Sequence, residues 1–221
     1  MKLKKIASLM LAGVMAVSML AGCKGSANSG EEENPVVPTT GVVAYANDAV
    51  SADDKEEYKF SGFTASTNLD SILKDLASST GDFSKDKISN IFVAPNKVEL
   101  NTAVQGKLND KLDGLLDDDG KFDDIPADNV SEKYGYIYTA SGKLTQEEAV
   151  SKMVDMFARN VLSDVAKTAV TNTTTDTKYD PAYSAEVSVV RVSSSSASDE
   201  SAWVLAIVLT QNVTKVSNTV E

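Results

Sequence analysis

Apolar residues recur at helical spacing in three parts of the chain. Residues 66–78 form a first amphipathic run, in which Thr67 or Asn68 can act as the helix cap, and residues 98–116 form a second. The third run starts after Thr145, which forms a capping box with Glu148. Its apolar residues lie on one stripe that is expected to face a core: Val150, Met153, Val154, Phe157, Val161, Leu162 and Val165.

Runs rich in β-branched and aromatic residues predict five strands, of which the last two form an antiparallel pair. The final run, residues 202–213, is apolar at both odd and even positions, so it is expected at the centre of a sheet. Elements in this order predict an α+β fold, with a mixed or antiparallel sheet of about four or five strands packed with three helices in a single domain. The predicted strands are residues 58–63 at an edge, 88–94, 134–139, 183–193 and 202–213.

The first residues have a different pattern, that of an export signal. Lys2, Lys4 and Lys5 precede an apolar run over residues 6–20 that is shorter than the about 20 residues of a membrane-spanning helix. The run ends in Leu20-Ala21-Gly22-Cys23, which resembles the lipobox of bacterial lipoproteins. The resemblance implies cleavage after Gly22 and a diacylglyceryl thioether on Cys23, with palmitate as a typical acyl chain. The mature protein would then be anchored in the cell membrane and face the extracytoplasmic side.

These patterns divide the chain into three parts. Residues 1–22 are expected to be the lipoprotein signal peptide, and residues 23–57 a lipidated, flexible linker, because Gly, Ser, Asn, Glu and Pro dominate there. Residues 58–221 are expected to form the extracytoplasmic α+β domain. Within the linker, residues 42–45 are an apolar island that is expected to dock on the domain.

Composition removes several function classes. The chain has no histidine, and Cys23 is its only cysteine, which excludes Ser-His-Asp and Cys-His catalysis, imidazole-based zinc sites and an intramolecular disulfide. The net charge is −11, and loss of the three signal-peptide lysines leaves 18 basic and 32 acidic residues, a net charge of −14. Such a surface repels nucleic acid, so no nucleic-acid partner is expected.

An acidic run at residues 117–124 suggests a calcium site built on Asp117, Asp119 and Asp123, because Ca²⁺ prefers hard oxygen ligands. The run is not an EF-hand, since that register puts Leu115 at the first position and Pro126 at the twelfth, where carboxylates are required. A solvated acidic loop is the alternative interpretation. No other cofactor is expected.

Ser-x-x-Lys occurs at Ser71/Lys74 and at Ser84/Lys87, a spacing in which a desolvated lysine can deprotonate a serine. The pattern is also frequent by chance, and the simpler interpretation is that Lys74 is an exposed helix residue. Neither pair is therefore assigned a catalytic role.

Three tyrosines, Tyr134, Tyr136 and Tyr138, alternate along one predicted strand and therefore face the same way. Such a row can bind sugar rings or peptides, or it can pack under a helix, and packing is the favoured interpretation.

Three functions remain open at this point. The favoured one is a membrane-tethered, non-catalytic binding or assembly module whose partner is a protein, a peptide or a wall polymer. The second is a histidine-free cell-wall hydrolase that uses carboxylates or a Ser-Lys pair. The third is a small solute-binding lipoprotein.

Overall fold

The fold is built on one mixed sheet, seen in a computed structural model that describes residues 36–38, 41–79, 81–112, 115, 122, 131–168, 170–172, 177–194 and 199–216. All of these residues belong to one compact unit, residues 31–221. The strand order is β1-β6-β7-β4-β3, with β2 and β5 also paired to β6. Among the residues that the structure describes, the seven strands are β1 (Val36–Pro38), β2 (Phe60–Ala65), β3 (Val98–Leu100), β4 (Ser131–Ser141), β5 (Val170–Asn172), β6 (Thr177–Ser193) and β7 (Ser201–Val216).

The last strand, β7, lies at the centre of the sheet, as its two apolar faces predict. It pairs antiparallel with β6 on one side and with β4 on the other. Its side chains alternate between two buried cores: Trp203, Leu205, Ile207 and Leu209 face one core, and Val204, Ala206 and Val208 face the other. The predicted antiparallel closing pair and its central position are both confirmed.

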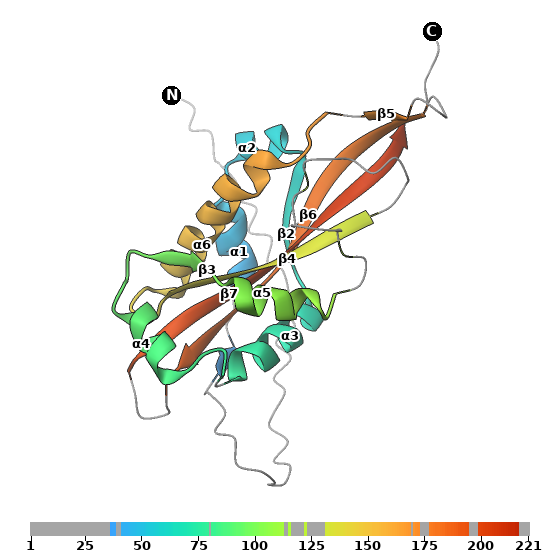
Figure 1. Cartoon of the computed structure of the whole chain (residues 1–221). Coiled ribbons are helices and arrows are strands. Elements are labelled where there is room, and N and C mark those ends of the chain that lie inside the picture. The colour runs from blue at the N-terminus through green and yellow to red at the C-terminus, as the bar shows by residue number, and fades with distance from the viewer. Residues whose placement is uncertain are drawn as a thin grey trace, which may run out of the picture. The chain divides into compact units, whose positions relative to one another are not determined.

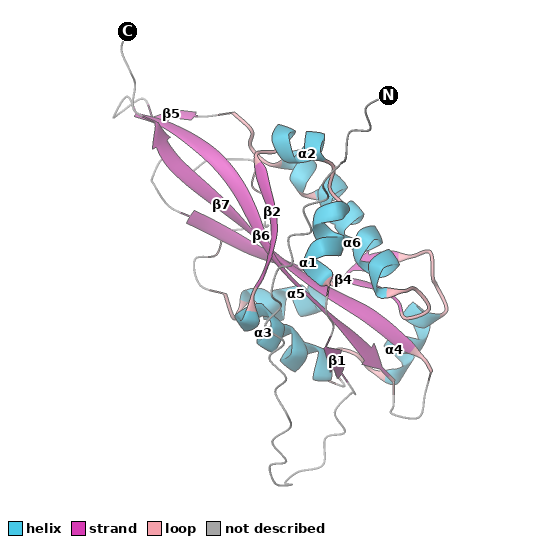
Figure 2. Ribbon diagram, turned by 180° about the vertical axis from the view of Figure 1, so that it is seen from behind, coloured by secondary structure: helices cyan, strands magenta, loops and turns pink. Residues whose placement is uncertain are grey.

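Helices cover both faces of this sheet, as Figures 1 and 2 show. The helices α1 and α6 pack on the face of Leu205, and α3, α4 and α5 pack on the face of Val204. The α+β class is therefore confirmed, but the described part of the chain contains six helices where three were expected. They are α1 (Val42–Asp48), α2 (Ala52–Glu57), α3 (Thr67–Ser78), α4 (Lys85–Phe92), α5 (Thr102–Asn109) and α6 (Gln146–Asn160).

The helix α6 follows the predicted capping box. The hydroxyl of Thr145 accepts the backbone N–H of Glu148, and the carboxylate of Glu148 accepts the backbone N–H of Thr145 at 2.9 Å. The helix ends at Asn160 and a 3₁₀ turn, Leu162–Asp164, follows it. The predicted stripe is buried at Val150, Met153, Val154, Phe157, Leu162 and Val165, and half-buried at Val161.

The first predicted helix is also present, as α3. Its cap is Ser66, whose hydroxyl accepts the backbone N–H of Leu69, and not Thr67 or Asn68. Because Ser66 has extended dihedrals, the first helical residue is Thr67.

The predicted strand at residues 88–94 is wrong, because this segment forms most of α4. The hydroxyl of Ser84 caps the helix by accepting the backbone N–H of Lys87. Ile88 is buried and Ile91 is half-buried, so the two apolar side chains meet the core at helical spacing. Burial on one face of a helix outweighs the β-propensity of the isoleucines.

The predicted helix at residues 98–116 is wrong at both ends, because α5 ends at Asn109 and residues 110–112 are not helical. Val98–Leu100 is the strand β3, and Leu100 is 42% exposed, so it does not belong to a buried stripe. Asn101 then donates its backbone N–H to the carbonyl of Ile137 on β4 at 2.7 Å and accepts the backbone N–H of Val104 with its side chain. The helix α5 begins only after this residue and is correspondingly short.

The linker predicted at residues 23–57 is wrong over residues 42–57, which fold into α1 and α2. Ala46 and Val50 are buried in the core, and Val42 and Val43 pack against it, which confirms the docking expected for residues 42–45. Farther upstream, β1 pairs with the outer edge of β6. The ordered domain therefore includes residues that were assigned to the tether.

Two asparagine side chains connect helices to the sheet by forming the pair of backbone hydrogen bonds that a neighbouring strand would form. Asn47 of α1 donates to the carbonyl of Phe63 at 2.9 Å and accepts its N–H at 3.0 Å. Asn109 of α5 does the same at Gly135 on β4, at 3.3 and 2.8 Å. Each amide therefore satisfies both backbone groups of one strand residue that would otherwise lack a ladder partner.

No helix in the part of the chain that the structure describes is long and apolar enough to cross a membrane.

Candidate functional site

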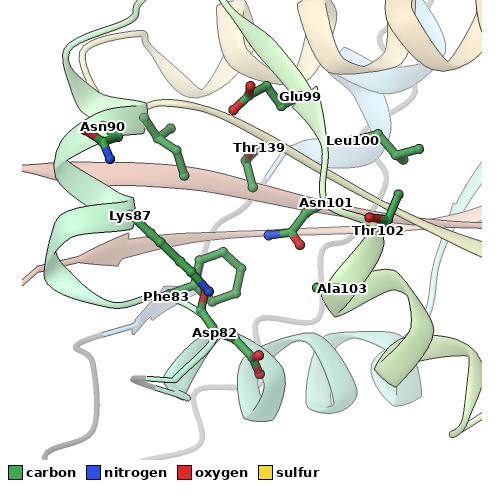
Figure 3. Close-up of a pocket in the computed structure, with 11 residues that line it drawn as sticks. Asp82, Phe83, Lys87, Asn90, Glu99, Leu100, Asn101, Thr102, Ala103 and Thr139 are labelled. Atoms are coloured by element: carbon green, nitrogen blue, oxygen red, sulfur yellow. The ribbon is translucent and has the colours of Figure 1, made fainter.

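A polar pocket of about 300 Å³ lies between α4, β3 and the start of α5. Figure 3 shows side chains from these elements directed into it, with Thr139 of β4 behind them. A smaller hollow of about 100 Å³ shares Asn90, Ile91, Glu99 and Thr139 with it and continues toward Lys97. The larger pocket is lined by Asp82, Phe83, Lys87, Asn90, Ile91, Glu99, Leu100, Asn101, Thr102, Ala103 and Thr139.

The segments on both sides of the pocket are fixed by core packing or by hydrogen bonds. Phe83 and Ile88 are buried in the core under α4, so the segment before the helix and its first turn are fixed. On the other side, the backbone and side-chain hydrogen bonds of Asn101 fix the junction between β3 and α5. Lining side chains are therefore presented by elements that are packed independently of any ligand.

Two carboxylates of the pocket are already neutralised by lysines. The ammonium of Lys107 lies 2.6 Å from each carboxylate oxygen of Asp82, whose side chain is only 12% exposed. Glu99 pairs with Lys97. Neither carboxylate is left as an uncompensated charge in the pocket.

Lys87 is placed differently. Its ammonium donates to the backbone carbonyls of Gly81 and Asp82, each at 3.2 Å, and it forms no ion pair with a carboxylate of the described residues. It is thus a positive charge whose counter-ion is not supplied by the described part of the chain.

Neither Ser-x-x-Lys pair has the geometry of a catalytic dyad. The hydroxyl of Ser71 donates to the carbonyl of Thr67, and Lys74 is exposed. Ser84 acts as the cap of α4, while the ammonium of Lys87 is engaged with backbone carbonyls. In neither pair does the side-chain nitrogen Nζ of the lysine form a hydrogen bond with the serine hydroxyl, as a general base would.

The tyrosine row packs in the core, as favoured. Tyr136 and Tyr138 are 5% and 2% exposed under α6, and the ring of Tyr136 lies 5.6 Å from that of Phe157. Burial raises the pKa of Tyr138 well above the usual tyrosine range. Tyr134 is half-buried. The alternative of a binding surface is therefore wrong for the row.

Other predicted site residues fall outside the described part of the chain. Cys23 lies there, and so do Asp117, Asp119 and Asp123 of the proposed calcium site. Among the residues that the structure does describe, no group of three His, Cys, Asp or Glu could hold a metal ion. The calcium site and the lipid anchor stay predictions.

Sequence reasoning missed the pocket itself. Its most specific polar groups, Asn90, Asn101 and Thr139, come from three elements and form no linear motif. One usable signal was present, because Asn is among the strongest helix caps and Asn101 precedes the apolar positions of α5. If the predicted helix had been started after Asn101, the sequence analysis would have separated β3 from α5.

Comparison with known proteins assigns no family to the chain: no protein-family model, no curated protein and no solved structure matches it. Its function is therefore inferred from its own residues and their geometry.

Proposed function

We propose that this protein is a lipid-anchored, extracytoplasmic binding module that takes its ligand in the pocket between α4, β3 and α5. The observation that carries the anchoring is the Leu20-Ala21-Gly22-Cys23 lipobox after a basic start and an apolar run. The single cysteine of the chain stands at the position that the lipid would modify.

Binding is favoured over catalysis by the state of the pocket's charged groups. A hydrolase needs a nucleophile and a base, or two carboxylates, free to act on a substrate. Asp82 and Glu99 are engaged with lysines, and Lys87 is engaged with backbone carbonyls. Such groups can recognise a ligand through their remaining hydrogen-bonding capacity.

If the chain is anchored at Cys23, the pairing of β1 limits the distance between the domain and the membrane. Because β1 pairs with β6, the tether ends at Val36 and not at Glu57. The covalent chain from Cys23 to Val36 spans at most about 45 Å. In the proposed arrangement the domain works near the membrane surface.

The anchoring is tested in bacteria that produce the full chain, by membrane fractionation and labelling with a palmitate analogue. Wild type should be in the membrane fraction and labelled, whereas Cys23→Ser should lose both properties. Ser26→Ala, three residues downstream, is the matched control and should behave as wild type. A Cys23→Ser protein that remains labelled and membrane-bound would show the anchoring to be wrong.

The binding role is tested with the full chain purified in detergent. A small-molecule extract of the cell envelope should raise the unfolding temperature of wild type, because a ligand that binds only the native state stabilises it by mass action. Ala103→Trp, which fills the pocket from the first turn of α5, should abolish the rise without lowering the unfolding temperature of the unliganded protein. An equal rise in both proteins would place binding elsewhere.

A further inference from the structure

The pocket has unused hydrogen-bond donors, while its two carboxylates, Asp82 and Glu99, are paired with lysines. An ammonium has three N–H donors, and Lys87 uses two of them on the carbonyls of Gly81 and Asp82. The side-chain oxygen of Asn101 accepts the N–H of Val104, which leaves the amide nitrogen free to donate. Figure 3 shows Lys87 and Asn101 directing their nitrogen atoms into the same space.

The charged residues of the pocket, taken together with their ion-pair partners, carry a net positive charge, although the chain as a whole is acidic. The carboxylates Asp82 and Glu99 are balanced by Lys107 and Lys97, and Lys87 remains as an additional cation. The five groups together carry one positive charge, on a chain whose net charge is −11. The charged groups of the pocket and their ion-pair partners therefore differ in sign from the chain as a whole.

We propose that the pocket binds the carboxylate of a small monoanionic ligand, held by Nζ of Lys87 and Nδ2 of Asn101, with the hydroxyl of Thr102 as a further donor. This inference rests on the proposed binding function. A charge-assisted hydrogen bond from an ammonium to a carboxylate is about twice as strong as a neutral one. One surplus cation and a few neutral donors suit a single negative charge.

The size of the pocket limits the rest of the ligand. At about 300 Å³ it is at the lower end for ligand pockets, which suits one or two amino-acid residues or one sugar ring. A peptide C-terminus and an acidic sugar both supply the required carboxylate. The exposed amide of Asn90 can bind the polar remainder of either ligand.

The test is a calorimetric or NMR titration of the full chain in detergent with N-acetyl-dialanine, its C-terminal amide, glucuronate, glucose and inorganic phosphate. At least one carboxylate probe should bind ten times or more tightly than its uncharged partner. Preference for the peptide acid or for glucuronate identifies the source of the carboxylate. Equal binding of acid and neutral probe, tighter binding of phosphate, or no binding of either acid would overturn the proposal.

Two variants assign the effect to the named atoms. Lys87→Met removes the charge and should weaken carboxylate binding at least tenfold. Asn101→Asp keeps the helix cap, since Asp caps as well as Asn, but replaces the donor by a negative acceptor, so binding should be lost while the unfolding temperature is kept. Lys74→Met, on the exposed side of α3, is the control and should bind as wild type. Wild-type binding by Asn101→Asp would contradict the assignment.

The outcomes separate the two proposals. If envelope extract stabilises wild type but not Ala103→Trp, and no carboxylate probe binds, the pocket is a binding site and only its ligand class is wrong. If the extract stabilises both proteins equally, the binding function assigned to this pocket fails as well.

Discussion

The two faces of the sheet are packed with different kinds of side chain. The aromatic face, covered by α1 and α6, buries eight aromatic rings, whereas the aliphatic face, covered by α3, α4 and α5, buries one, Phe83. The pocket lies on the aliphatic face, where α4 and α5 have eight residues each. The difference suggests that the large rings under the long helix α6 stabilise the fold, whereas the short helices α4 and α5 leave space for the pocket. The aromatic residues of the first face are Phe60, Phe63, Phe122, Tyr136, Tyr138, Phe157, Tyr183 and Trp203.

The largest expected effect comes from removing a ring at the centre of the aromatic face. Phe157 is fully buried and its ring contacts those of Phe63 and Tyr136. Phe157→Ala should lower the free energy of unfolding by about 3–5 kcal/mol, measured by urea denaturation. Because the pocket is on the opposite face, ligand affinity of the folded protein should change less than twofold. A large loss of ligand affinity in a fully folded Phe157→Ala protein would contradict the independence of the two faces.

The elements that sequence analysis predicted correctly are long and locally consistent. The helix α6 has a capping box and an apolar stripe, and β7 is apolar on both faces. In both elements the residue propensities, the apolar pattern and the observed burial indicate the same secondary structure. In α4 these indications disagree, because the β-branched residues Ile88 and Ile91 favour a strand, whereas in the structure they contact the core from one face of a helix. Short elements of this kind depend on tertiary contacts that a single sequence does not display.

The pocket could not be predicted for the same reason. Two of the elements that line it, α4 and β3, were assigned the wrong conformation, so Lys87 and Asn101 could not be brought together. Its charge balance depends on Lys107, which reaches Asp82 across 25 positions of sequence. The lipobox, in contrast, is a contiguous signal and can be read without a fold.

On the aliphatic face, α5 packs closely on β4 at Gly135. A Cβ added at Gly135 would lie 2.6 Å from Leu108 Cδ2 and 2.8 Å from the side-chain oxygen of Asn109, so in Gly135→Ala these two buried side chains of α5 must shift and the hydrogen bonds of Asn109 to residue 135 are disturbed. We expect a loss of about 1–3 kcal/mol in the free energy of unfolding and weaker ligand binding, because α5 lines the pocket.

The control for this change is Gly106→Ala, on the same helix. A Cβ at Gly106 meets no atom within 4 Å, and Ala is the better helix former, so this variant should gain about 0.5–1 kcal/mol. Urea denaturation of both variants measures the change in the free energy of unfolding that each substitution causes. If Gly135→Ala were as stable as Gly106→Ala, close packing of α5 on β4 would not be needed for the fold.

The smallest expected effect concerns the cap of α6 on the aromatic face. The backbone N–H of Thr145, its hydroxyl and nearby Lys152 lower the pKa of the exposed Glu148 carboxyl. A lowered pKa in the folded state means that the ionised group adds stability above the ordinary glutamate pKa and that this stability is lost as the pH falls through the folded-state value. Glu148→Gln keeps a neutral capping box but removes the charge near the start of the helix. Urea midpoints of the two proteins should therefore differ slightly at pH 7 and converge in acid, whereas a difference independent of pH would mean that the charge of Glu148 plays no part in holding α6.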